Sequence, residues 1–153
     1  MGCDIHVYIE KKVGDKYEHL GAVEVFDCRS YALFGFLAGV RNYSAVAPIA
    51  PERGIPEDVS TYVAKKYDSW GYNAHSASWL SVEELTSFDY GAMTEDRRTI
   101  KQTGANRWNG GCTCAPGEGQ AMTYREFLGE WYFDEIKKLQ DSDADRIVFW
   151  FDN

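Results

Sequence analysis

Both ends of the chain alternate with a two-residue period, and this alternation constrains the fold more than any other feature of the sequence. From Cys3 to Glu10 every second residue is apolar. In the last segment, Ile147, Phe149 and Phe151 fall on one side, and Val148 and Trp150 on the other. Successive side chains of a β-strand point to opposite faces of the sheet, so this period predicts strands. We therefore expect both ends of the chain to be strands of a sheet.

Turn and capping signals divide the rest of the chain into short elements. The turn-rich segment 13–16 predicts a hairpin whose second arm runs from Tyr17 to Phe26. Segments 81–84 and 123–126 both have the capping-box pattern, in which a hydroxyl and a glutamate satisfy each other's backbone donors at the start of a helix. Together these signals predict helices over 30–40, 58–67, 81–88 and 123–139, a strand over 76–80, an extended segment over 90–102 and a loop over 104–120.

The predicted fold class is α+β. We expect a small mixed or antiparallel sheet, formed by the N-terminal hairpin and the C-terminal strand and packed with three to four helices. The chain has 153 residues, of which 44% are hydrophobic and 26% charged, which predicts a single domain over residues 1–153. Among its many aromatic residues we expect Trp131, Phe149 and Phe151 to lie in the core.

Charge and hydropathy narrow the classes of function. No apolar run approaches the roughly 18 residues that span a bilayer, and the N-terminus lacks the pattern of a signal peptide, so we expect a cytoplasmic protein that does not enter membranes. The formal charge of −8 disfavours binding to duplex nucleic acid. A small anionic ligand is compatible with this charge, because a few arginines can hold a phosphate locally.

The first candidate site is on the N-terminal strand. Asp4 and His6 share one face about 7 Å apart, a spacing suited to metal ligation or to acid/base chemistry. If Asp152 lies beside Asp4, two carboxylates and an imidazole converge. The alternative is the ordinary polar face of a strand.

The second candidate is the segment around His75, Ser76 and Ser78, preceded by Trp70 and Tyr72. Serine, histidine and aspartate occur here, but the nucleophile elbow of serine hydrolases does not. These side chains could instead bond loop backbone, or they could hold a ribose and a base.

The cysteines give a third candidate. Cys112 and Cys114 form a Cys-x-Cys pair, for which Cys3 and His6 are distant candidate zinc ligands. This pattern is weaker than paired Cys-x-x-Cys motifs, so free thiols are the alternative. We therefore expect no cofactor. The alternative is a structural zinc or a divalent metal.

The fourth candidate is a set of aromatic, arginine and amide side chains in irregular segments, where stacking faces and guanidinium groups can gather around a nucleotide. In addition to His6, Tyr8 and the residues near His75, this set comprises Arg41, Asn42, Tyr43, Arg97, Arg98 and Trp108.

Several sequence blocks together resemble a family of small bacteriophage and prophage proteins. The blocks are Met1–His6, Tyr31–Phe34, Val40–Asn42, Arg53–Ser60, Trp70 with His75–Ser78, and Arg146–Asn153. They cover both ends and the middle of the chain, whereas the glycine-rich stretch 104–120 lies outside them. The resemblance carries over no residue roles.

The phage resemblance implies an anti-defence role by analogy with phage proteins that sequester host immune nucleotides. The expected function is binding of a cyclic ADP-ribose-type nucleotide or a cyclic dinucleotide, with a homo-oligomer as one arrangement. The first alternative is a metal-dependent phosphodiesterase or hydrolase that uses Asp4, His6, His75 and Asp152. The second is a phage accessory protein that docks on a host protein through exposed aromatic residues.

Overall fold

The computed structural model describes residues 2–99 and 113–153, which form helices and two antiparallel sheets. This confirms the predicted α+β class. The chain divides into two compact units, which are described separately below. Unit 1 comprises Met1–Arg29, Glu52–Phe88 and Trp131–Asn153, and unit 2 comprises Ser30–Pro51 and Asp89–Glu130. Within the described ranges, no helix is long and apolar enough to cross a membrane.

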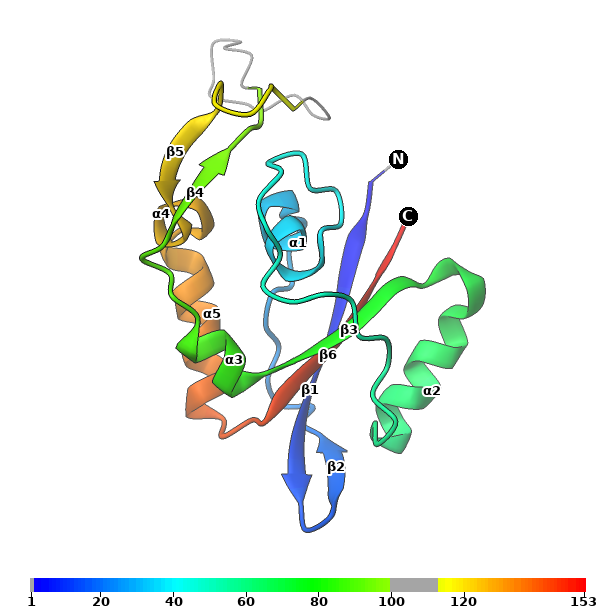
Figure 1. Ribbon diagram of the computed structural model, residues 1–153. Helices are drawn as coiled ribbons and strands as arrows, with labels where there is room; N and C mark the ends of the chain where they lie inside the picture. The colour runs from blue at the N-terminus through cyan, green and yellow to red at the C-terminus, as the bar shows by residue number, and fades with distance from the viewer. Residues whose placement is uncertain (1, 100–112) are drawn as a thin grey trace. The chain divides into compact units, whose positions relative to one another are not determined.

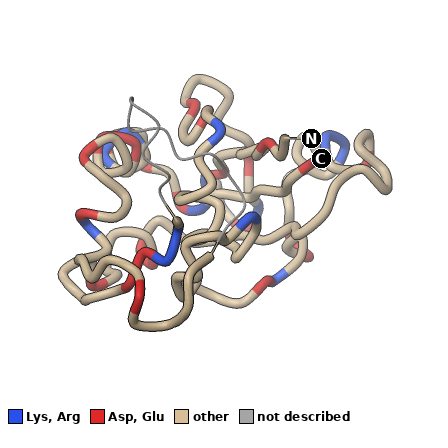
Figure 2. Tube along the Cα trace, turned by 90° about the horizontal axis from the view of Figure 1, so that it is seen from above, with Lys and Arg blue, Asp and Glu red and all other residues tan. Residues whose placement is uncertain are grey.

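Unit 1 is built on a four-stranded antiparallel sheet with the order β2-β1-β6-β3. The strands are β1 (Asp4–Val13), β2 (Lys16–His19), β3 (His75–Ser81) and β6 (Arg146–Asp152). The expectation that both ends of the chain are sheet strands is confirmed. They are neighbours, so the two termini lie side by side in Figures 1 and 2, and Asp4 is opposite Asp152.

The hairpin is shorter than predicted. The second arm ends at His19 rather than at Phe26, because the chain turns at Gly21 and leaves the sheet. The Phe26 N–H then donates to the Glu135 carboxylate at 3.1 Å instead of to a strand. As a result, β2 pairs only with the C-terminal part of β1, from Glu10 onward.

Helices α2 (Thr61–Trp70) and α5 (Glu130–Asp141) lie on opposite sides of this sheet (Figure 1). The predicted helix over 58–67 begins three residues later, because Ser60 is the N-cap. Val63 of α2 packs with Val148 and Trp150 of β6 in one buried cluster. On α5, the buried residues are Tyr132, Glu135, Ile136 and Leu139.

Two short helical elements flank β3. Helix α3 (Val82–Ser87) follows it and begins with the predicted capping box, in which Ser81 and Glu84 each bond the other's backbone N–H. The 3₁₀ turn η1 (Gly71–Asn73) precedes it.

A bulge interrupts the pairing of β3 with β6. His75 is opposite Phe151 and Ser78 is opposite Phe149, so three steps along β3 match two along β6. Ser76 is in the left-handed region at φ 54°. The extra residue places His75 on the same face of the sheet as Phe151. His6, which is opposite Trp150, lies on the other face, the one that α2 covers.

Unit 2 contains helix α1 (Tyr31–Ala38), helix α4 (Tyr124–Leu128) and a two-stranded sheet of β4 (Met93–Asp96) and β5 (Gln120–Thr123). Ser30 caps α1 as predicted, and Gly39 ends it at φ 69°. The capping box at Thr123 is also present.

The prediction of one helix over 123–139 is wrong. Gly129, at φ 80°, ends α4, and α5 starts at the next residue. The expectation that Trp131 belongs to the core is also wrong, because this residue is 40% exposed. Phe149 and Phe151 are fully buried, as predicted.

Candidate functional site

A row of aromatic rings runs along the face of unit 1 that α2 covers. We define the aromatic row as Trp70, His6, Tyr8, His19 and Tyr62. The Trp70 and His6 ring centroids are 4.3 Å apart, and those of Tyr8 and His19 are 5.6 Å apart. Strand β1 supplies His6 and Tyr8 because its even-numbered side chains share a face, and β2 and α2 supply the other members.

Trp150 forms the buried base of the aromatic row. Its indole is fully buried and lies 5.0 Å from the Tyr8 ring, nearly parallel at 15°, and 6.3 Å from the His6 ring. Its Nε1 has no hydrogen-bond partner among the described residues. Burial raises the pKa of the Tyr8 hydroxyl, with a smaller contribution from Tyr62, so Tyr8 stays protonated at neutral pH.

His6 is held in place by a carboxylate from the last strand. Its Nε2 is 2.7 Å from Asp152 Oδ2, and each side chain is 24% exposed. The pair exists because β1 and β6 are neighbours, which the sequence alone does not establish. A carboxylate bonded to one ring nitrogen fixes the orientation of an imidazole. His6 is therefore positioned against Trp70.

The aromatic row ends at the protein surface in two stacked rings. The His19 and Tyr62 rings stack at 4.3 Å with an angle of 8°, and Tyr62 is 47% exposed. Burial lowers the pKa of His19, so its ring is neutral at pH 7. A groove of about 410 Å³ adjoins this pair and is also lined by Lys16 and Thr61. Lys66 Nζ lies 5.4 Å from the centroid of the Tyr62 ring.

The four residues of the hydrolase alternative do not form one cluster. Asp4 is paired with Arg29 through two hydrogen bonds of 2.9 and 2.7 Å. This pairing lowers the pKa of the Asp4 carboxyl, chiefly through the Arg29 hydrogen bond. His75 lies on the opposite face of the sheet from His6. Of the four, only His6 and Asp152 are joined by a hydrogen bond.

The segment around His75 has mainly local contacts. His75 Nδ1 is 3.0 Å from Ser76 Oγ, and the His75 ring stacks on Phe151 at 6.1 Å. Ser78 is buried, and its hydroxyl accepts a hydrogen bond from the Arg53 N–H. Tyr72 is 97% exposed in η1. Ser78 therefore supports a loop, as the backbone-bonding alternative predicts.

The predicted arginine and amide residues fall in unit 2 and have structural partners there. Arg97 donates two hydrogen bonds to the Cys114 carbonyl, and Arg98 pairs with Asp96 at 2.6 Å. Arg41 donates to the Tyr43 hydroxyl at 3.3 Å.

Asn42, the remaining member of that set in unit 2, holds a turn. Its amide donates to the Val46 carbonyl at 2.8 Å and accepts from the Val46 N–H at 3.3 Å. Both ends of the amide are thus bonded to backbone. Trp108, the last predicted ligand contact, lies outside the described residues.

The thiols are dispersed. Cys3 is buried, Cys28 is exposed and Cys114 is partly exposed, whereas Cys112 lies outside the described residues. Across residues 2–99 and 113–153, no three His, Cys, Asp or Glu side chains are grouped so that they could hold a metal ion. Lysine and arginine are interspersed with acidic residues along the described trace (Figure 2).

Sequence reasoning missed two of the five members of the aromatic row. His19 and Tyr62 belong to a shortened hairpin arm and to the exposed side of a helix, where each looks like an ordinary surface residue. The hairpin register offered a signal, because pairing Glu10 with His19 puts His19 on the same face as Tyr8. The position of Tyr62 depends on where α2 sits on the sheet.

Comparisons with protein-family models, curated proteins and solved structures find no match for this chain.

Proposed function

We propose that this protein binds a nucleotide by stacking the base on the aromatic row and releases it unchanged. The observation that carries this proposal is the His19 and Tyr62 pair, which is parallel, partly exposed and adjacent to a groove. Aromatic side chains of this kind stack on any base, and each such contact contributes about 1–3 kcal/mol. A ring already stacked on a second ring loses little further freedom when a base is added.

The charges around the groove support a ligand with a phosphate. Lys16 lines the groove and Lys66 lies over the Tyr62 ring. Their ammonium groups can pair with a phosphate although the chain has a net charge of −8. Glu18 also lines the groove, which favours a ligand with few phosphates over a polyanion.

In a phage setting, such a protein would sequester a host immune nucleotide and so counter a defence that depends on that signal. Cyclic ADP-ribose-type nucleotides and cyclic dinucleotides are the two ligand classes that this proposal covers. The role requires binding without turnover. The His6 and Asp152 pair is the feature of the described residues that favours the hydrolase alternative.

Isothermal titration calorimetry with cyclic ADP-ribose, cyclic di-AMP and AMP tests the proposal, and chromatography of the released ligand tests for turnover. We expect Tyr62→Ala to weaken binding by about 5- to 150-fold, since loss of one stacking contact is worth about 1–3 kcal/mol. Tyr72→Ala is the matched control, because Tyr72 is an exposed tyrosine outside the row. Equal losses in both variants, or no binding by the unmodified protein, contradict the proposal. Recovery of a cleaved ligand favours the hydrolase alternative.

A further inference from the structure

Strand β1 has an unpaired edge along its N-terminal half. Strand β2 pairs with β1 only from Glu10 to Val13. The Leu20 N–H donates to the Ile9 carbonyl at 2.8 Å, so the main-chain groups of Ile9 point away from β6. Because these directions alternate along a strand, the N–H and C=O groups of Ile5 and Val7 point the same way. Among the described residues, neither Ile5 nor Val7 has a backbone partner on that side.

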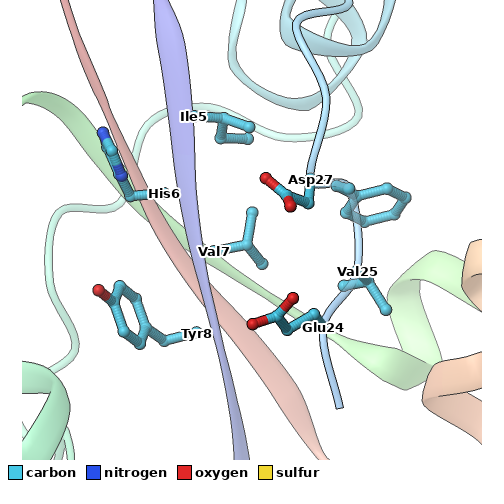
Figure 3. Close-up of a pocket in the computed structure, with 8 residues that line it drawn as sticks. Ile5, His6, Val7, Tyr8, Glu24, Val25 and Asp27 are labelled. Atoms are coloured by element: carbon cyan, nitrogen blue, oxygen red, sulfur yellow. The ribbon is translucent and has the colours of Figure 1, made fainter. Parts of the chain in front are cut away.

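A slot lies along this edge. Its walls are Ile5–Tyr8 of β1 and the segment Glu24–Asp27, and its volume is about 250 Å³ (Figure 3). The side chains of Ile5 and Val7 are only partly buried, and Figure 3 shows them pointing toward the 24–27 segment. The unpaired main-chain groups of a strand edge are a template for pairing with another chain, so a slot bordered by free N–H and C=O groups suits another backbone.

The far wall of the slot is acidic. Figure 3 shows the carboxylates of Glu24 and Asp27 directed toward β1. Both residues are exposed, and neither has a salt bridge or a side-chain hydrogen bond within the described part of the chain. Two unpaired carboxylates beside free main-chain groups favour a partner that carries positive charge.

We propose that the slot between β1 and residues 24–27 binds an extended basic peptide, which adds to the sheet as a strand beside β1. The peptide exchanges main-chain hydrogen bonds with Ile5 and Val7, and its lysine or arginine side chains pair with Glu24 and Asp27. This is the β-augmentation mode of peptide recognition, in which the main chain provides affinity and the side chains provide selectivity. The two residues that present free groups span about 7 Å, which limits the paired core to a few peptide residues.

A labelled peptide of alternating lysine and valine, acetylated and five residues long, is the direct probe. Fluorescence anisotropy should show binding that weakens as salt is added, and a glutamate-for-lysine version should bind at least about tenfold more weakly. Two N-methylated versions provide a backbone control. Methylation of the amides of one alternating set should abolish binding, whereas methylation of the other set should not, because only one set faces β1. Equal binding of both versions would overturn the proposal.

Amide hydrogen exchange locates the bound strand. In the free protein the N–H groups of Ile5 and Val7 should exchange quickly, while those of His6 and Tyr8, which face β6, are protected. The peptide should slow exchange at Ile5 and Val7 alone. Protection confined to Tyr62 and His19 would place the peptide in the other groove and overturn the assignment.

A proline substitution tests whether the backbone N–H of Val7 donates a hydrogen bond to the peptide. Val7→Pro removes an N–H that no partner in residues 2–99 or 113–153 uses, and proline is tolerated on the free edge of a strand. We expect at least about a tenfold loss of peptide affinity, because the bound strand loses a hydrogen-bond donor. Val7→Thr keeps the N–H and the branched side chain and should bind within about twofold of the unmodified protein.

The acidic wall is tested separately. Glu24→Gln with Asp27→Asn should remove most of the salt dependence of peptide binding and leave the fold intact, since both residues are exposed. Unchanged salt dependence contradicts the assigned role of the two carboxylates.

Ile5→Pro repeats the test of the strand edge if Val7→Pro does not fold. Binding that survives a folded proline variant shows that no β-strand pairing occurs.

Discussion

Glu10 and Arg146 are opposite each other on β1 and β6 and form a buried ion pair, with Glu10 Oε1 2.8 Å from Arg146 Nε. Their side chains are 0% and 4% exposed. The second Glu10 oxygen accepts a hydrogen bond from the Ser60 N–H, and Arg146 also bonds Asp58 at 2.8 Å. The pair thus links the sheet to the start of α2, the helix that carries Tyr62 and Trp70 of the aromatic row.

Arg146→Leu should therefore be strongly destabilising. The substitution leaves the Glu10 carboxylate buried without its counter-charge, a change that costs about 3–5 kcal/mol. Urea unfolding followed by circular dichroism measures the effect. Adding Glu10→Gln removes the uncompensated charge while keeping an acceptor for Ser60, so the double variant should be more stable than Arg146→Leu alone. A single variant as stable as the double would contradict this account.

Glu84 makes the free energy of unfolding of unit 1 decrease at acid pH. Its carboxylate bonds Arg53 Nη1 at 2.9 Å and the Ser81 N–H at 2.8 Å. These contacts, led by the Arg53 hydrogen bond, lower the pKa of Glu84 from 4.5 to about 2. The resulting stabilisation is fully present above pH 4.5 and is lost as the pH falls toward 2.

Glu84→Gln should accordingly lower the free energy of unfolding at pH 6 and have little effect near pH 2. The Glu84 side chain is 37% exposed. Solvent screens the interaction, and the expected loss is only about 1 kcal/mol. Thermal unfolding across this pH range gives the difference. Glu83→Gln, one residue earlier at an exposed position, is the control and should not reproduce the trend.

The bulge at Ser76 predicts an unusual preference for glycine. Ser76 is in the left-handed region at φ 54°, where a β-branched side chain is strained. Ser76→Val should be less stable than Ser76→Gly by about 1–3 kcal/mol. Both variants lose the contact between Ser76 Oγ and His75, so the difference between them measures the free-energy cost of the left-handed backbone conformation. Equal unfolding temperatures would contradict the strain that the left-handed conformation of Ser76 predicts.

Local sequence signals were sufficient for much of unit 1. Alternation identified β1 and β6, and hydroxyl and glutamate spacing identified the start of α3, because these features depend on residues close in sequence. The same signals did not predict where a single backbone torsion ends a helix or changes the face on which a side chain lies. Gly129 divides the predicted last helix, and Ser76 turns His75 away from His6, yet neither event interrupts the hydrophobic pattern.

The candidate site was predictable only in part. His6, Tyr8 and Trp70 were chosen as aromatic or polar residues near loops and strand faces, and the structure brings them together. Arg97 and Arg98 of unit 2 were chosen on the same grounds, but they bond a nearby carbonyl oxygen and a nearby carboxylate. A sequence does not reveal whether a guanidinium already has a partner in the folded protein. Composition alone therefore does not separate an arginine that is free to bind a ligand from one that is paired within the fold.

Asn42 provides a test of that distinction. Because both ends of its amide bond Val46, Asn42→Ala should destabilise the protein by about 1–3 kcal/mol and leave nucleotide affinity unchanged. Unfolding in urea and calorimetry with the same ligand measure the two properties. A loss of affinity without a loss of stability would restore Asn42 to the ligand site.

Gly35 is in close contact with the Asn42 side chain, and this contact gives a further prediction. A Cβ placed on Gly35 would be 2.5 Å from Asn42 Oδ1, so Gly35→Ala alone should be destabilising by about 1–3 kcal/mol although alanine is the better helix former. In the Asn42→Ala background the obstructing oxygen is gone, and the same substitution should become neutral or stabilising by up to about 1 kcal/mol. A double-mutant cycle measures this change of sign. If Gly35→Ala costs the same in both backgrounds, the glycine is required for a reason other than its contact with Asn42.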